Sequence, residues 1–514
     1  MNQPYPMPQK WLKFFVIIIL ILGIFFRFAS LNQKVYWEDE TYTSLWLAGY
    51  DDKITTELAY NNQQIFINDL HKYQQLNSDN NINDTLNILK KRSEHPPIYY
   101  VLARFWAQCF GSSVTAMRSF PALISLFIFP CIYWLCLELF EFSTVGWLAM
   151  ALVAVSPFFV RYAQEVRQYS LWAVMILLSS TLFLRAIRLK TKVAWIAYAA
   201  IMSLSFYSHL FSILVLISHG IYLLIMQRFR LNRTAIAYLL ASSFAILSFT
   251  PWVWFIITKR AFDVMEWIKV PLPFLSLLKK WSLNLCHLFV SWNYEYDNLL
   301  IYLSIPALLL VIYSICFLCR NTEERVWLFI LTLIAVTALA FVLPDLISGG
   351  RRSTVDRYFT PCYLGLEIAV AYLLASQINS INSSLQRVRL WQIATSLLIS
   401  AGVLSCAIDL QAETWWGKDK FIVDMSRVIN QASDPIVISD ARLGQVMPLS
   451  YRLNPKVGLL LFVQPNVPKI PDGYSDIFLF NPSKKFIADL QQEQNIKIDS
   501  IYQKEISLWR LNKI

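Results

Sequence analysis

Apolar runs about as long as a bilayer is thick recur along the chain as far as residue 408. A helix that crosses the hydrocarbon core needs roughly 20 predominantly apolar residues. We therefore expect an α-helical polytopic membrane protein with about eleven transmembrane helices. The predicted spans cover residues 11–29, 117–137, 144–160, 169–187, 194–209, 211–227, 235–257, 299–319, 326–344, 358–376 and 389–408.

Short connections rich in Lys and Arg set the expected orientation of these spans. They lie at residues 185–192, 227–233, 319–325 and 386–389, and all fall on the same side as the N-terminus. Because basic loops stay in the cytoplasm, we predict a cytoplasmic N-terminus and an extracytoplasmic C-terminus in the plasma (inner) membrane. The apolar stretch 97–110 is only about half a bilayer long, and we expect an interfacial helix there.

The composition agrees with a membrane protein. Of the 514 residues, 56% are hydrophobic and 15% are charged, whereas a soluble domain has about 25% charged residues. The net charge of +11 does not require nucleic acid as a partner, because basic residues are expected in cytoplasmic loops and beside membrane lipids or lipid phosphates. The eight cysteines end at Cys406 and nearly all lie in apolar runs, which argues against a disulfide framework.

The chain changes character after residue 408. Short apolar runs typical of strands alternate with helical patterns. We predict a small extracytoplasmic α/β domain over residues 409–514, and a transmembrane domain over residues 1–408 in which 30–116 form the first outer loop with interfacial helices. The strand-like runs are 435–439, 457–463, 475–480, 496–498 and 506–511, and the helical patterns are 420–431 and 483–492.

Three adjacent carboxylates, Glu38, Asp39 and Glu40, follow the first predicted span. Ionised carboxylates are costly to bury, so they must face water or a polar cavity. A solvated helix flank explains them, and so does a catalytic site at the membrane surface. His95 stands before Pro96 and a predicted helix start, where it is either a surface residue or part of the same site.

Charged and aromatic side chains also gather in the later outer loops. Arginine matches phosphate geometry with paired donors, but Arg and Tyr also anchor helices at the membrane interface, and both interpretations stay open. The stretch 258–298 mixes charged and aromatic residues in the same way. The candidates for ligand contact are Arg161, Glu165, Arg167, Tyr169, His209, Arg357 and Tyr358, with weaker cases at Arg351 and Arg352.

The order of these motifs resembles that of the GT-C membrane glycosyltransferases of glycosyltransferase family 39, which include protein O-mannosyltransferases and aminoarabinose transferases. The likeness covers roughly residues 10–410 and leaves the tail uncovered. It rests on an Asp-Glu pair after the first span, then His-Pro-Pro-Ile-Tyr-Tyr, Arg-Ser-Phe-Pro-Ala-Leu, Gln-Glu-Val-Arg-Gln-Tyr and Arg-Tyr-Phe-Thr-Pro.

The resemblance implies a hexosyl- or pentosyltransferase that moves a sugar, with inversion, from a polyprenyl-phosphate-linked donor to a lipid, glycan or protein acceptor on the outer face. Asp39 matches the essential carboxylate, which is the proposed base, and Glu40 is its neighbour in the motif. The third acid, Glu38, is one that many members lack, so the base could have shifted. His95 matches the His-Pro-Pro motif, Arg167 and Arg357 match positions that hold the donor phosphate, and Glu165 and Tyr169 complete the loop pattern.

This chemistry needs a carboxylate to accept the acceptor's proton and cations to stabilise the departing phosphate. No cofactor is required, although carboxylates and phosphate together can recruit a divalent cation such as Mg²⁺. The alternatives are a transporter or flippase of a lipid-linked saccharide, or an envelope polysaccharide polymerase or ligase. A transporter would place ionisable groups near the middle of the membrane, whereas the polar groups here crowd the outer edge.

Overall fold

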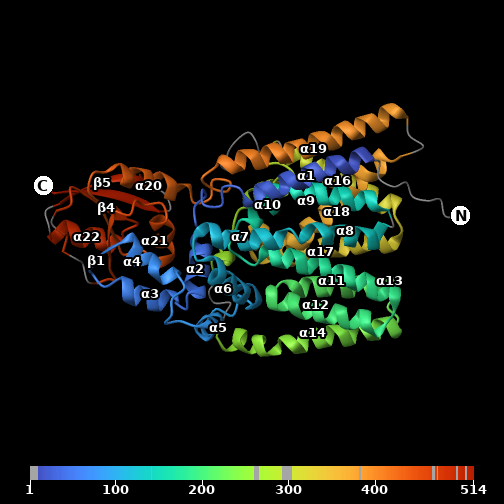
Figure 1. Ribbon diagram of the computed structural model, residues 1–514, viewed down its shortest axis with the longest axis horizontal. Helices are drawn as coiled ribbons and strands as arrows, with labels where there is room; N and C mark the ends of the chain where they lie inside the picture. Colours follow the sequence, from blue (N-terminus) through green and yellow to red (C-terminus); the bar gives the residue numbers. More distant parts are fainter. Residues whose placement is uncertain are drawn as a thin grey trace. The chain divides into compact units, whose positions relative to one another are not determined.

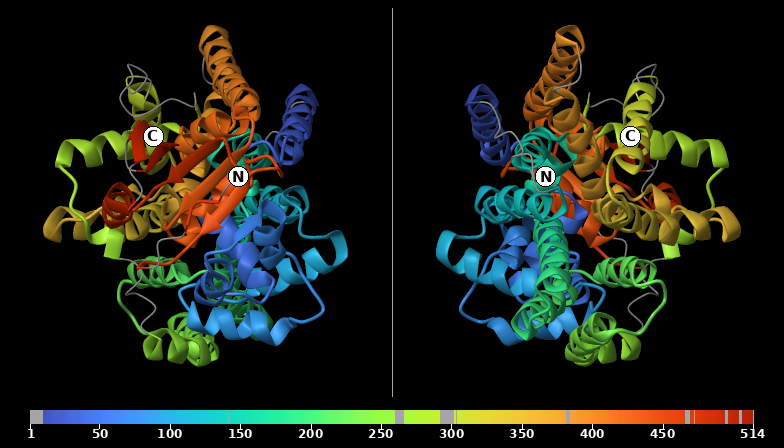
Figure 2. Two further views of the ribbon diagram at one scale, coloured as in Figure 1. Left: turned by 90° about the vertical axis from the view of Figure 1, so that its left-hand side faces the viewer. Right: turned by 90° about the vertical axis from the view of Figure 1, so that its right-hand side faces the viewer.

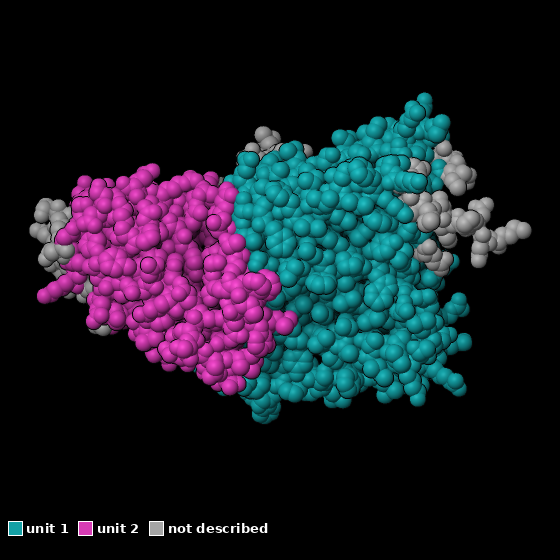
Figure 3. All heavy atoms as spheres, in the orientation of Figure 1, with its two compact units in different colours: residues 1–31, 89–99, 118–411 teal, residues 32–88, 100–117, 412–514 magenta. Residues whose placement is uncertain are grey.

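The computed structural model describes residues 10–140, 142–259, 266–291, 302, 304–380, 384–465, 469–471, 473–493, 496–503 and 506–513. Much of the polar stretch 258–298, including Arg260, Asp263 and residues 292–298, lies outside the described residues. The chain divides into two compact units, which Figure 3 shows in different colours. Unit 1 comprises residues 1–31, 89–99 and 118–411, and unit 2 comprises residues 32–88, 100–117 and 412–514.

Unit 1 is a bundle of long helices that lie side by side (Figures 1 and 2). A helix is present at every predicted span. Eight helical segments of the described chain are long and apolar enough to cross a membrane, one of them made of α7 and α8 and another of η5 and α18. The bent pair α9–α10 makes a ninth. α12 and α13 are shorter, with 17 and 15 residues. The helices are α1 (Lys10–Phe28), α7 (Val114–Ser125), α8 (Ile128–Phe140), α9 (Ser143–Val155), α10 (Pro157–Ala163), α11 (Tyr169–Leu189), α12 (Lys192–Ser208), α13 (Ser212–Met226), α14 (Arg233–Thr258), α15 (Phe274–Cys286), α16 (Ser304–Asn321), α17 (Glu324–Ser348), α18 (Thr360–Ile378) and α19 (Leu385–Gln411), with the 3-10 turns η4 (Arg352–Thr354) and η5 (Asp356–Phe359) before α18.

The break between α9 and α10 shapes one end of this bundle. The two helices meet at 63°, and Pro157 at the break has no N–H to donate to the carbonyl of Val153. The N–H of Phe158 donates outside the helix, so the carbonyl of Ala154 also loses its partner in the helix. The buried guanidinium of Arg27 in α1 donates to both carbonyls, at 2.9 Å to Val153 and 2.6 Å to Ala154. Arg27 therefore satisfies the carbonyls that the break exposes.

α1 is held against this break by close packing and by a cap. A Cβ atom on Gly23 would lie 2.6 Å from the carbonyl oxygen of Ala154, so a larger residue would push α1 away from α9. Beyond α10, the amide of Gln164 donates to the carbonyls of Phe26 (2.8 Å) and Ala29 (2.9 Å) at the end of α1. These carbonyls would otherwise lack partners, and the bonds fix the loop after α10 to the same end of the bundle.

Unit 2 is built on a six-stranded sheet with the order β1-β3-β2-β4-β6-β5. β2, β3 and β4 run parallel to one another, while β1, β6 and β5 are antiparallel to their neighbours. Five strands of the tail confirm the predicted α/β fold. The sixth, β1, comes from the first outer loop and was not expected. The strands are β1 (Gln64–Phe66), β2 (Pro435–Ser439), β3 (Gly458–Leu461), β4 (Asp476–Phe480), β5 (Ile496–Gln503) and β6 (Ser507–Lys513).

Alternate residues of the parallel strands enter two separate cores, because successive side chains of a strand point to opposite faces. Ile436 and Leu460 belong to one core and Val437 and Leu459 to the other. The second of these cores also takes Leu70 and other side chains of the first loop, so loop and tail form one fold. The helices of unit 2 are α2 (Glu38–Leu47), α3 (Asp52–Ala59), α4 (Ile67–His71), α5 (Ile82–Lys91), α6 (Ile98–Phe110), α20 (Lys420–Gln431), α21 (Leu443–Ser450) and α22 (Lys484–Glu493), with the 3-10 turn η1 (Lys72–Gln74).

Candidate functional site

Several of the predicted contact residues meet in unit 1, although they come from distant parts of the chain. They lie in the segment 89–99, in α10 and the loop that follows it, at the start of α11, at the end of α12, and in η5 before α18. We call this group the arginine cluster. It consists of His95, Arg161, Tyr162, Glu165, Arg167, Tyr169, His209, Asp356, Arg357 and Tyr358.

Arg161 and Asp356 form the buried part of the arginine cluster. The Nη1 atom of Arg161 donates to Oδ2 of Asp356 at 3.2 Å, and its Nε lies 3.9 Å from a carboxylate oxygen of Glu165. The hydroxyl of Tyr162 donates to Oδ1 of Asp356 at 2.6 Å, and the backbone N–H of Arg357 donates to the same oxygen at 2.9 Å. Asp356 thereby fixes α10 to η5, 195 residues further along the chain.

Arg167 and His95 contact one another. The Nη2 atom of Arg167 lies 3.4 Å from both ring nitrogens of His95. Burial and the nearby cations Arg167, Arg92 and Arg357 hold the pKa of His95 well below its ordinary value. His95 is therefore neutral at physiological pH and can accept a hydrogen bond from the guanidinium.

Aromatic rings also contact members of the arginine cluster. The ring of Tyr169 packs edge-to-face on Tyr162, with 5.1 Å between ring centroids. The guanidinium of Arg357 lies over Tyr169 at 5.8 Å and over Tyr358 at 5.6 Å. Such cation–π contacts help to hold the guanidinium of Arg357 in this half-buried position.

His209 lies at the end of α12, on the ring of Trp172. The two rings are stacked with 4.0 Å between centroids, and Nδ1 of His209 accepts the backbone N–H of Phe211 at 3.2 Å. The proton of the neutral ring is therefore on Nε2. These contacts fix the orientation of the ring, which the sequence could not predict.

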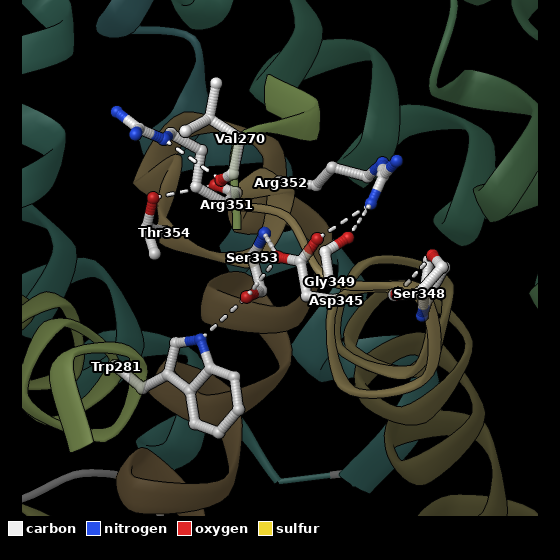
Figure 4. A network of polar contacts seen from close by, with 10 residues as sticks. Val270, Trp281, Asp345, Ser348, Gly349, Arg351, Arg352, Ser353 and Thr354 are labelled. Atoms are coloured by element: carbon white, nitrogen blue, oxygen red, sulfur yellow. Dashed lines mark hydrogen bonds and ion pairs between the residues drawn. The ribbon is translucent and has the colours of Figure 1, made fainter. Parts of the chain in front are cut away.

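Arg351 and Arg352 help to hold the turn that leads into η5 (Figure 4). Arg352 donates to Oδ1 of Asp345 at 3.0 Å, and the other carboxylate oxygen accepts from the backbone and the hydroxyl of Ser353, each at 2.7 Å. Trp281 of α15 donates to the same hydroxyl at 2.9 Å. Asp345 and Arg352 thus have a structural role in shaping the turn that carries Asp356 and Arg357.

The predicted catalytic acids Asp39 and Glu40 belong to unit 2. Together with Glu38 they form the first turn of α2, where negative charge is favourable at the positive end of the helix dipole. Glu40 is buried, with 1% of its surface exposed. Burial and the charge of Asp39 raise the pKa of Glu38. That these acids meet the arginine cluster in one pocket stays a prediction.

Two members of the arginine cluster, Tyr162 and Asp356, were not among the predicted site residues. Both stand next to predicted ones, and an Asp beside Arg357 in an otherwise basic loop was the available signal. No group of three or more His, Cys, Asp or Glu residues in the described part of the chain could hold a metal ion. All eight cysteines, which are all described, are free thiols.

Solved structures with the same fold come from membrane glycosyltransferases. ArnT from Cupriavidus metallidurans in the apo state matches with a TM-score of 0.52 and 12% identity over 97% of both chains. Its complex with undecaprenyl phosphate matches with a TM-score of 0.50 and 11% identity over 97% of this chain and 98% of that one. The apo oligosaccharyltransferase of Archaeoglobus fulgidus matches with a TM-score of 0.50 and 12% identity over 88% of this chain and 65% of that one. The chain therefore has the GT-C fold.

A comparison with models of protein families gives one match, which covers part of the chain. Residues 94–255 match the family model described as dolichyl-phosphate-mannose-protein mannosyltransferase. The match includes His95, Arg161 and Arg167 but spans less than half of the chain, and no curated protein matches the sequence. The resemblance to GT-C glycosyltransferases of the family 39 type is thus confirmed, and the chain is a multi-pass membrane protein with the GT-C fold.

Proposed function

We propose that the protein transfers a hexose or pentose, with inversion, from a polyprenyl-phosphate-linked donor to a lipid, glycan or protein acceptor. The reaction takes place on the non-cytoplasmic face of the plasma (inner) membrane, with the N-terminus in the cytoplasm. The observation that carries this proposal is the cluster that contains Arg161, Arg167 and Arg357 at one end of the helix bundle, where Arg167 contacts a neutral His95.

The electrostatic potential in the arginine cluster favours an anion. The charges that lower the pKa of His95 are cationic and come from three separate arginines, Arg92, Arg167 and Arg357. Arg161 is held by two carboxylates. We assign the phosphate contact to Arg167 and Arg357, the two arginines that the family motifs match. Guanidinium groups stabilise the charge that a phosphate gains as it departs.

The comparisons support a lipid phosphate as the anion. The ArnT structure with the same fold contains undecaprenyl phosphate, and the matched family is described by a dolichyl-phosphate sugar. Both are long-chain polyprenyl phosphates, a class that a site at the end of membrane-spanning helices can bind from the bilayer.

Asp39 is the proposed base that removes the acceptor's proton. The carbonyl of Ala29, at the end of α1, accepts a hydrogen bond from Gln164. Only residues 30–37 separate Ala29 from the first turn of α2. Burial, together with the charge of Asp39, raises the pKa of Glu38 in the same turn, and a carboxylate positioned beside the acceptor hydroxyl can act as a base. Glu40 is its buried neighbour.

Replacing Asp39 by Asn tests the base. We expect Asp39→Asn to abolish sugar transfer by purified protein supplied with polyprenyl-phosphate sugars, because the amide cannot accept the proton. Glu38→Gln serves as the matched control and should keep most of the activity. Full activity of Asp39→Asn would exclude it as the base, and loss of activity only in Glu38→Gln would move the assignment to that residue.

Replacing Arg357 by Ala tests the phosphate contact. Loss of a charge-assisted hydrogen bond should raise the KM for donor by roughly 10- to 100-fold. Arg230→Ala, which removes an exposed arginine outside the arginine cluster, should leave the KM within about twofold. An unchanged donor KM in Arg357→Ala would remove this residue from the donor site. Uptake of labelled saccharide into vesicles without transfer would instead favour a transporter.

A further inference from the structure

A polar pocket lies within unit 2, and none of its residues belongs to the arginine cluster. Its volume is about 910 Å³, which is within the usual range of ligand pockets, roughly 300–1,000 Å³. The loop 75–82 forms one wall and residues 104–114, from α6 and the turn after it, form a second. His71 and Tyr451 complete the lining. We call this the amide pocket.

Side-chain amides supply much of the lining. Gln75, Asn80 and Gln108 line the amide pocket and make no side-chain hydrogen bond with the described part of the chain. An amide carries two N–H donors and a carbonyl acceptor, so it suits a ligand whose groups also donate and accept. Hydroxyl groups do both. None of the described residues that line the pocket is Asp, Glu or Lys, so its lining is not that of a site for a metal ion or an ammonium group.

Arg104 is the one permanently charged side chain among the lining residues, and it is 2% exposed. Its Nη atoms donate to the carbonyls of Leu47 and Asn80 and to the hydroxyl of Thr85. Its Nε has no hydrogen-bond partner among the described residues. Leaving a buried N–H unsatisfied is costly, so this part of the lining is held at an energetic cost.

The loop that carries the amides is fixed by the protein itself. The carbonyl of the Asn77 side chain accepts the backbone N–H groups of Asp79 (3.1 Å) and Asn80 (3.0 Å), and its amide donates to the hydroxyl of Tyr50 (3.1 Å). On the opposite wall, the hydroxyl of Ser112 accepts the N–H of Leu76 at 3.3 Å. A site fixed in this way loses little conformational entropy when it binds a ligand.

An aromatic pair completes the wall. The rings of His71 and Tyr451 are stacked with 4.2 Å between centroids, and Nε2 of His71 lies 2.8 Å from the hydroxyl of Ser450. Burial keeps His71 uncharged at neutral pH, since its pKa is lowered to about 4. Aromatic side chains in the lining of a pocket can contact the weakly positive C–H groups of a sugar.

We propose that the amide pocket binds a neutral saccharide. Uncharged amides, hydroxyls and an aromatic pair are complementary to the hydroxyl groups and C–H faces of such a ligand, and the absence of acidic lining residues fits a ligand without cationic groups. This is a second carbohydrate site in the chain. It goes beyond the transfer reaction proposed above and does not depend on it.

Isothermal titration calorimetry of the full-length protein in lipid nanodiscs tests this site by measuring the binding of chitotriose, mannotriose and cellotriose. Nanodiscs are needed because detergents with sugar headgroups would compete. At least one trisaccharide should bind, and the double variant Gln75→Ala/Gln108→Ala should bind it at least about tenfold more weakly. Gln63→Ala/Gln431→Ala, which alters two exposed residues of unit 2 outside the pocket, should bind it as the wild type does.

Three outcomes would overturn the proposal. These are no binding of any of the three probes at millimolar concentration, equal affinity of the Gln75→Ala/Gln108→Ala variant, and tighter binding of the acidic trisaccharide trigalacturonate. Thermal unfolding of each variant shows that it is folded. Arg357→Ala separates this proposal from the transferase, because it should retain saccharide binding even though it loses donor affinity.

Discussion

At the scale of single residues, Asp356 accepts hydrogen bonds from Arg161, from the hydroxyl of Tyr162 and from the backbone N–H of Arg357. A buried carboxylate with three donors is held in place by the protein. Its role is therefore to orient Arg161 and to fix η5, which carries Arg357.

We expect Asp356→Asn to lower kcat/KM for transfer at least about tenfold, because the amide keeps the size of the side chain but loses the charge that pairs with Arg161. Tyr162→Phe removes only one of the three bonds and should cost about three- to tenfold. Both are measured by steady-state transfer kinetics, with thermal unfolding as a check on folding. Activity of Asp356→Asn equal to that of the wild type would show that this ion pair does not orient the site.

His71 makes the stability of the protein depend on pH. Its pKa is lowered by burial from 6.5 to about 4 in the folded state, so the unfolded chain takes up the proton first as the pH falls. The contribution of neutral His71 to the free energy of unfolding is fully present above about pH 6.5 and is lost as the pH falls toward 4. At about pH 5 the loss amounts to about 2 kcal/mol.

His71→Gln removes this titration and retains a side chain that can bond to Ser450. Denaturant unfolding at pH 7.5 and pH 5 should therefore show a smaller difference between the two pH values in the variant, by about 2 kcal/mol. If the difference is the same in both proteins, His71 is already protonated or exposed in the folded state.

Sequence motifs predicted most members of the arginine cluster, because each is marked by a charge in an otherwise apolar setting. Arg161, Arg167 and Arg357 were recognisable in this way. Asp356 and Tyr162 were missed, because their contact joins residues 194 positions apart, and such pairing has no local signature. Arg27, a charge within the first predicted span, was also passed over, although charges at that depth are rare.

At the scale of elements, the bend between α9 and α10 depends on Arg27. We expect Arg27→Met to lower the free energy of unfolding by about 3 kcal/mol, because it leaves the carbonyls of Val153 and Ala154 without donors in an apolar surrounding. Thermal unfolding in nanodiscs measures the loss. Arg230→Met, at an exposed position, is the matched control, and an equal effect of both substitutions would contradict this role.

Elements with strong periodicity were predicted well from the sequence. Long apolar runs identified the spans, and short buried runs identified β2 and β4. β1 was missed, because it has three residues, two of them exposed, and it is held by backbone pairing with β3. α21 was missed because Pro448 lies inside it, and proline usually argues against a helix.

At the scale of the whole molecule, the pairing of β1 with β3 constrains the topology. β1 follows α1, and β3 lies in the tail after α19. Loop and tail must therefore be on the same side of the membrane, so an even number of crossings separates them. Of the eight described spans and the bent pair, only α1 precedes the loop, and eight crossings remain. The hairpin of α12 and α13 adds two or none, which keeps the number even.

The shared core of unit 2 predicts that the tail does not fold alone. Residues 412–514 without the loop would expose the surface that Leu45, Ile67 and Leu70 cover, and these side chains are 1%, 3% and 0% exposed. We expect the isolated tail to give a poorly dispersed NMR spectrum, and a fusion to residues 32–88 to restore dispersion. A well-dispersed spectrum of the tail alone would refute this dependence.

The separation of β1 from β3 also has a consequence for biogenesis. Gln64 pairs with Leu460, so the ribosome must add about 400 residues after β1 emerges before its partner exists. At the usual speed of synthesis this takes between roughly twenty seconds and more than a minute. During that interval the apolar surface of the nascent loop is open to misassociation, and it must be shielded until the partner strand has been synthesised.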